Sequence, residues 1–228
     1  MKNIRSGICL LVLGVFIFGS KESIAKRDEE IKSCLPGELK TWKDGLDRPI
    51  KQRLVTFAYQ PSGQSLLSSS DVRQMISEAA RVWSKCGIKV MLGTDVSSDT
   101  TPENLRVTVK WGSPSMEGVA HANISSSVLL LSPKIFQILK DKGGESLLKD
   151  TLQMTLSHEM GHFLGMMSHS MRCVDVMSYY TSPSGEKCFL RDSNQFYSVP
   201  EYRSKLPTAC DIERCKRLNG NLPPIQRQ

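Results

Sequence analysis

The 228-residue sequence has few aromatic residues and only four histidines, and it contains no internal repeat, low-complexity tract or linker rich in proline, glycine and serine. Without such a linker the chain is expected to form one domain, and its hydrophobic content of 39% is enough for a buried core. Beyond the first 25 residues, no apolar run approaches the roughly 20 residues that a membrane-spanning helix needs. We therefore expect no stable membrane insertion of the mature chain.

The charge pattern argues against a nucleic-acid partner. The formal net charge is +7, but the basic residues are scattered, with one modest cluster at Arg214, Lys216 and Arg217. Proteins that bind nucleic acids usually gather basic residues on one face. No nucleic acid is therefore expected.

The first residues have the features of a secretory signal. Two basic residues precede an apolar run from Ile8 to Phe18, and Ser23-Ile24-Ala25 is typical of a cleavage site. We expect residues 1–25 to be a signal peptide and the mature chain to be secreted or periplasmic. Residues 26–50 are predicted to be irregular and residues 51–228 to form the folded domain.

The cysteines indicate an oxidising compartment. Cys9 lies in the predicted signal, and the six cysteines that remain favour disulfides in an exported chain. Cys210 and Cys215 are expected to share a helix, in which five residues span about 7.5 Å. Cα atoms more than about 7 Å apart cannot be bridged, so these two cysteines should pair elsewhere.

Hydrophobic patterns predict a mixed α/β (α+β) domain. A continuous apolar stripe predicts a helix over residues 71–85, with Trp83 in the core, and a second long helix is expected from about residue 146 to 164, after a break at Gly143-Gly144. Alternation or β-branched content predicts strands at residues 54–59, 88–92, 105–111, 119–123 and 128–131.

The second helix carries a metal-binding pattern. His158-Glu159-Met160-Gly161-His162 places two imidazoles one turn apart on the same helix face, where both can reach one ion. A catalytic zinc takes three protein ligands and keeps a fourth position for water. Gly165 can end the helix and return His169 to the metal. The pattern predicts one catalytic Zn²⁺ held by His158, His162 and His169, with Glu159 as general base.

With the segment Val174-Asp175-Val176-Met177-Ser178-Tyr179 beyond it, this motif resembles that of the metzincins, zinc metalloproteases in which a turn carrying methionine lies beneath the metal. Residues 71–85, 118–122 and 206–220 resemble the first helix, edge strand and last helix of matrixins. The resemblance covers most of residues 50–220. It implies a twisted mixed five-stranded sheet with an antiparallel edge strand, three main helices and a smaller irregular C-terminal subdomain.

The resemblance also implies roles for individual residues. Met177 is a hydrophobic floor and not a ligand, and an extended polypeptide substrate adds as a strand beside Gly118, Val119 and Ala120. Met177-Ser178-Tyr179 is closer to serralysins and astacins. In these families the equivalent of Tyr179 helps to stabilise the tetrahedral intermediate, although an ordinary role in the pocket wall stays open.

The third ligand departs from the metzincin pattern, because its usual position is occupied by Ser168 and histidine comes one residue later. Either the turn carries one extra residue, or another group such as Asp175 completes the shell; His169 is favoured because a neutral imidazole matches its partners. If the third ligand were instead a downstream glutamate such as Glu186 or Glu201, the chain would belong to a different clan of zinc enzymes.

Matrixins also bind calcium and a second, structural zinc. His121 occupies the position of a structural-zinc histidine, but its partners are missing, so we interpret it as a strand residue near the cleft. Calcium is possible but not indicated.

Cys173 and Cys188 bracket Met177 and Tyr179, and a bridge between them would close a loop of about 16 residues, worth roughly 3 kcal/mol. If they pair, Cys34 and Cys86 are each tied to the last helix. The sequence thus predicts a secreted zinc endopeptidase; the competing hypothesis is a catalytically inactive protein- or peptide-binding module on a metzincin scaffold, its metal shell disrupted by the longer spacing.

Overall fold

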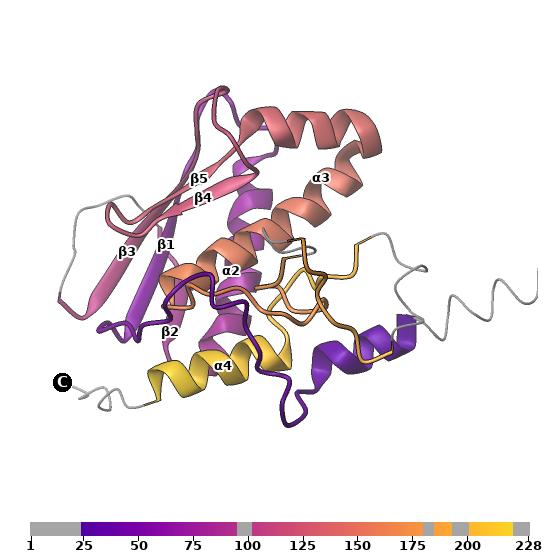
Figure 1. Ribbon diagram of the computed structural model, residues 1–228. Helices are drawn as coiled ribbons and strands as arrows, with labels where there is room; N and C mark the ends of the chain where they lie inside the picture. Colours follow the sequence, from indigo (N-terminus) through magenta and orange to yellow (C-terminus); the bar gives the residue numbers. More distant parts are fainter. Residues whose placement is uncertain (1–23, 95–101, 180–184, 193–200, 221–228) are drawn as a thin grey trace, which may run out of the picture.

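The structure is a computed structural model that describes residues 24–94, 102–179, 185–192 and 201–220 (Figure 1). The predicted signal peptide falls almost entirely outside the described residues. Within the described ranges, no helix combines the length and the apolar character needed to cross a membrane.

One mixed sheet forms the frame of the molecule. Its strands are β1 (Leu54–Gln60), β2 (Lys89–Leu92), β3 (Asn104–Trp111), β4 (Ala120–Asn123) and β5 (Val128–Leu131). The order is β2-β1-β3-β5-β4; β4 runs antiparallel to β5 at one edge, while the other neighbours are parallel. This confirms the predicted five-stranded sheet and its antiparallel edge strand.

Helix α2 (Ser69–Trp83) packs beside the sheet and beside α3 (Pro133–Phe163) (Figure 1). It begins at Ser68, whose hydroxyl accepts a hydrogen bond from the Asp71 amide. Its apolar stripe is buried as predicted, and the fully buried Trp83 donates its indole N–H to the carbonyl of Ser157 at 2.9 Å. The 3₁₀ turn η1 (Ser84–Cys86) leads from α2 towards β2.

Helix α3 (Pro133–Phe163) is longer than predicted and bends at Gly144, which has a φ of 69°. The expected break at the glycine pair is present, but helix also precedes it. Ser132 caps this first part, Pro133 opens it, and Phe136 anchors it by an edge contact with Trp111. Most of the other side chains in this part are exposed, so its apolar periodicity is weak.

Helix α4 (Ala209–Asn219) carries two of the disulfides. Thr208 and Asp211 form a reciprocal capping box at its start. Cα atoms are 4.8 Å apart in Cys34–Cys210, 5.5 Å in Cys86–Cys215 and 5.0 Å in Cys173–Cys188. The three pairs agree with the predicted pattern.

The prediction of an irregular segment over residues 26–50 is wrong at its beginning, because residues 24–32 are helical. This short helix is held by distant partners that a local pattern does not reveal. Arg27 donates to the carbonyls of Tyr202 and Arg203, and Arg172 donates to the carbonyl of Glu30. The rest of the segment runs beside the loops that follow α3 (Figure 1).

The described residues between α3 and α4 form no regular strand or helix, only isolated bridges such as Ser170 with Ser178 and Arg172 with Phe189. They have a small core of their own, made of Cys173, Val174, Cys188 and Tyr202. The predicted irregular C-terminal subdomain is therefore present in the described residues, and it carries one wall of the site.

Candidate metal centre

The end of α3 presents two of the histidines and then reverses the chain. The Leu164 and Gly165 amides donate to the carbonyls of Gly161 and His162, and Gly165 takes a φ of 90°. A Cβ at this position would also overlap the carbonyl oxygen of Arg48. Glycine is therefore required here for two reasons, and the turn directs the chain back towards His169.

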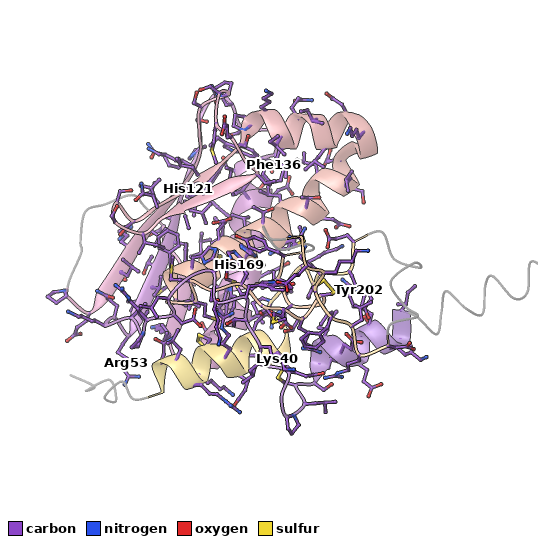
Figure 2. The ribbon with its side chains drawn as sticks, in the orientation of Figure 1. Lys40, Arg53, His121, Phe136, His169 and Tyr202 are labelled. Carbon is purple, nitrogen blue, oxygen red and sulfur yellow. A yellow bond between two sulfur atoms is a disulfide. The ribbon has the colours of Figure 1, made fainter. Side chains whose placement is uncertain are left out.

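The structure brings His158, His162 and His169 together. One ligand nitrogen from each lies within 4.8 Å of the other two, and the ring centroids are 5.0 to 5.2 Å apart. His169 is 7% exposed and stands on the loop after α3, near the centre of the view in Figure 2. The one-residue-longer spacing does not keep its ring away from the other two.

Each imidazole has a hydrogen-bond partner for Nδ1, at 2.7 Å in all three cases. The partners are the carbonyl of Val176 for His158, the carbonyl of Met166 for His162, and the carboxylate of Asp44 for His169. Carbonyl and carboxylate oxygens accept, so Nδ1 carries the proton in every ring. The Nε2 lone pairs are left for a metal, which is the usual arrangement around zinc-binding histidines.

Burial also keeps the imidazoles neutral. It lowers the pKa of His158 well below its ordinary value, that of His162 to about 4, and that of His169 despite the opposing effect of Asp44. A metal binds only the neutral ring. The three histidines therefore fit a single zinc or similar ion without first losing protons at neutral pH.

Glu159 lies beside this cluster in the same cleft. Burial raises the pKa of its carboxyl to about 7, and the backbone N–H of Ala122 in β4, which donates to it, opposes that rise. A carboxyl that titrates near neutrality can accept and release a proton at the working pH. Its contact with β4 places it between the histidine cluster and the sheet edge.

Met177 lies against the helix that carries His158 and His162. It is fully buried, and its sulfur lies where a Cβ on Gly161 would project. The carboxylate of Asp211 accepts hydrogen bonds from the amides of Val176 and Met177, at 2.9 and 3.4 Å. The turn carrying Met177 is thus tied to the start of α4, a role for Asp211 that the sequence did not indicate.

Tyr179 stacks on His169, with ring centroids 3.6 Å apart and an interplanar angle of 19°. Burial raises the pKa of its hydroxyl, and the carboxylates of Asp44 and Glu159 add to this effect. The phenol is therefore protonated at neutral pH and available as a donor.

The cleft has a volume of about 500 Å³. Val119, Ala120, His121 and Ala122 line it from β4 and the residue before it, and Thr151, Met154 and Thr155 line it from α3. Gly118 precedes this edge with a φ of 77°. His121 belongs to β4 and lines the cleft, as predicted.

The other ligands considered from the sequence are engaged elsewhere. Asp175 is buried and accepts hydrogen bonds from Arg172, Ser170 and Thr208. Glu201 pairs with Arg203 at 2.8 Å. Among the residues that the structure describes, neither they nor Glu186 join the histidine cluster.

Asp44 and Asp47 contact the loop that carries His169. The sequence predicted neither of these contacts. Asp44 accepts from the amide and the ring of His169, and Asp47 accepts from the amides of Met167 and Ser168. Burial alone would raise the pKa of Asp44, but its hydrogen bonds with His169 outweigh this and lower it. More than a hundred residues separate these partners, so no local spacing could have identified them.

A scan of the chain against protein-family models finds no match, and a search of curated proteins finds none either.

Proposed function

We propose that the protein is a secreted zinc-dependent endopeptidase of the metzincin type. The observation that carries the proposal is the convergence of three neutral imidazoles, each with its Nδ1 proton held by an acceptor, beside a buried carboxyl that titrates near pH 7. A purely structural metal site has no need for the adjacent carboxyl or for an open cleft.

His158, His162 and His169 would hold the ion, and Met177 would support them from below. Zinc bound there would acidify a water molecule and polarise the scissile carbonyl. Glu159 is positioned to accept the proton of the attacking water and to pass it to the nitrogen of the departing amine. Ala122, which donates to the Glu159 carboxylate, keeps this base next to the edge strand.

The edge of β4 supports a peptide substrate in extended conformation. In an antiparallel pair, backbone groups alternate between the two sides of a strand. The N–H of Ala122 faces Glu159 and not β5, so the backbone groups of Ala120 are expected to face the cleft as well. A polypeptide can therefore add beside Gly118, Val119 and Ala120 and bring its carbonyl to the metal site.

Tyr179 supplies a protonated hydroxyl at the rim of the same site, because its ring covers His169. We assign it the stabilisation of negative charge on the tetrahedral intermediate. The three disulfides support export, since such bridges persist in oxidising compartments.

The proposal is tested with purified protein and an unstructured substrate such as casein. We expect about one zinc per chain, cleavage that a chelator abolishes and zinc restores, and a loss of cleavage in Glu159→Gln with zinc content unchanged. Glu117→Gln, which alters an exposed glutamate that does not line the cleft, is the control and should cleave normally. A purified protein that binds no zinc would support the inactive binding module, whose metal shell is disrupted, instead.

A further inference from the structure

Asp44 makes three hydrogen bonds to the two residues at the unusual end of the zinc motif. Its Oδ1 accepts from the His169 amide at 2.8 Å and from the Ser168 hydroxyl at 3.1 Å. Its Oδ2 accepts from Nδ1 of the His169 ring at 2.7 Å. One carboxylate therefore binds both the backbone and the side chain of the third histidine.

The neighbouring contacts hold the whole turn. Asp47 accepts from the amides of Met167 and Ser168 at 2.9 and 2.8 Å, and Arg214 of α4 bridges Asp47 and the carbonyl of Ser168. The amides of Trp42 and Arg48 donate to the carbonyls of His169 and Gly165. The segment before β1 thus lies along the turn and satisfies its backbone groups, which compensates for the extra residue between Gly165 and His169.

We propose that Asp44 is a positioning residue that holds His169 in the Nδ1–H tautomer with Nε2 directed at the metal. This rests on the proposed function only in treating His169 as a zinc ligand. The His158 and His162 rings obtain the same tautomer from carbonyls close in sequence or on the Met177 turn. His169 alone depends on a side chain from the N-terminal segment, so the third ligand is completed by a distant part of the chain.

An asparagine at position 44 separates this role from general support of the turn. Its single carbonyl oxygen can serve the His169 amide or the ring, and its NH₂ group must face the other. The backbone N–H can only donate, whereas the ring can change its tautomer, so the oxygen is expected to face the amide. The NH₂ then donates to Nδ1 and forces the proton to Nε2, which cannot bind a metal in that form. Asp47 touches the same turn but not the ring, so Asp47→Asn is the matched control.

The test begins with the metal-free wild-type protein labelled with ¹⁵N. Long-range ¹H–¹⁵N correlations report which ring nitrogen of His169 is protonated. We expect the Nδ1–H form; an Nε2–H form in the wild type would overturn the proposal without any variant. In Asp44→Asn we expect the Nε2–H form, and in Asp47→Asn the Nδ1–H form.

Zinc affinity, measured by competition with a chromophoric chelator, gives the second readout. We expect Asp44→Asn to weaken zinc binding about 10- to 100-fold, and Asp47→Asn to weaken it less. Unchanged tautomer and affinity in Asp44→Asn would overturn the positioning role. If the wild type shows the expected tautomer and binds no zinc, the proposed function fails while the assignment of Asp44 stands.

Discussion

The sulfur of Met177 lies where a Cβ on Gly161 would project. The same added Cβ would meet the indole of Trp83 at 3.0 Å, so the helix carrying His158 and His162 touches both the Met177 turn and α2 at this glycine. These three elements can approach this closely only because residue 161 has no side chain.

Gly161→Ala should therefore destabilise the fold, although alanine is the better helix former. Overpacking of this kind costs about 1–3 kcal/mol, against a gain of at most about 1 kcal/mol from helix propensity. We expect the free energy of unfolding in urea to fall by about 1–2 kcal/mol. Gly63→Ala is the control, because nothing lies within 4 Å of its Cβ and its stability should change little. Equal stability of both variants would contradict the packing described.

The acidity of Glu159 predicts a pH-dependent stability in the metal-free protein. Below about pH 4.5, the carboxyl is protonated both in the folded and in the unfolded chain, and Glu159→Gln should match the wild type. As pH rises through the folded pKa of about 7, ionisation favours the unfolded chain, so the wild type loses stability that the glutamine variant keeps.

The difference should reach about 3 kcal/mol at pH 8, because the folded pKa of about 7 lies above the ordinary value of 4.5. Urea unfolding at pH 4 and pH 8 in the presence of a chelator measures it. A difference that is the same at both pH values would show that Glu159 is not buried as described.

Tyr179→Phe keeps the ring that stacks on His169 and removes only the hydroxyl. If the hydroxyl stabilises the intermediate, kcat falls about 100-fold, as for the loss of one oxyanion donor, while zinc content stays the same. Steady-state kinetics on a fluorogenic peptide check this. A changed KM with an unchanged kcat would assign Tyr179 to the pocket wall.

The Cys173–Cys188 bridge closes the loop that bears Met177 and Tyr179. Replacing both cysteines by serine should lower the free energy of unfolding by about 3 kcal/mol, mainly through the freedom gained by the unfolded chain. Thermal and urea unfolding measure the loss. Peptide mapping without reduction is the independent check, and finding either cysteine linked to Cys34 or Cys86 would contradict the structure.

The predicted strands agree with the observed ones within one residue at each end, because alternation such as Val107, Val109 and Trp111 against polar neighbours is a local signal. The first part of α3 was not predicted because few of its side chains besides Phe136 are buried, which leaves little apolar periodicity in the sequence. The helix over residues 24–32 was not predicted because it depends on distant contacts, with Arg172 and with the carbonyls of residues 202–203.

The candidate site also contains residues that the sequence predicts and residues that it does not. His158 and His162 were predicted from their spacing on the helix, and His169 was predicted from its place near them in the chain. Asp44 and Asp211 could not be found, since their partners lie more than thirty residues away and a lone aspartate has no pattern. The folded chain, and not the motif, explains how a longer spacing still returns the third imidazole to the other two.

Zinc K-edge absorption of the purified protein, compared between the wild type and His169→Ala, tests the central claim most directly. We predict one zinc with three imidazole nitrogens at about 2.0–2.1 Å and a fourth light-atom ligand, and the loss of one imidazole in the variant. A spectrum that the substitution leaves unchanged, or a wild-type protein that holds no zinc, would contradict the three-histidine centre.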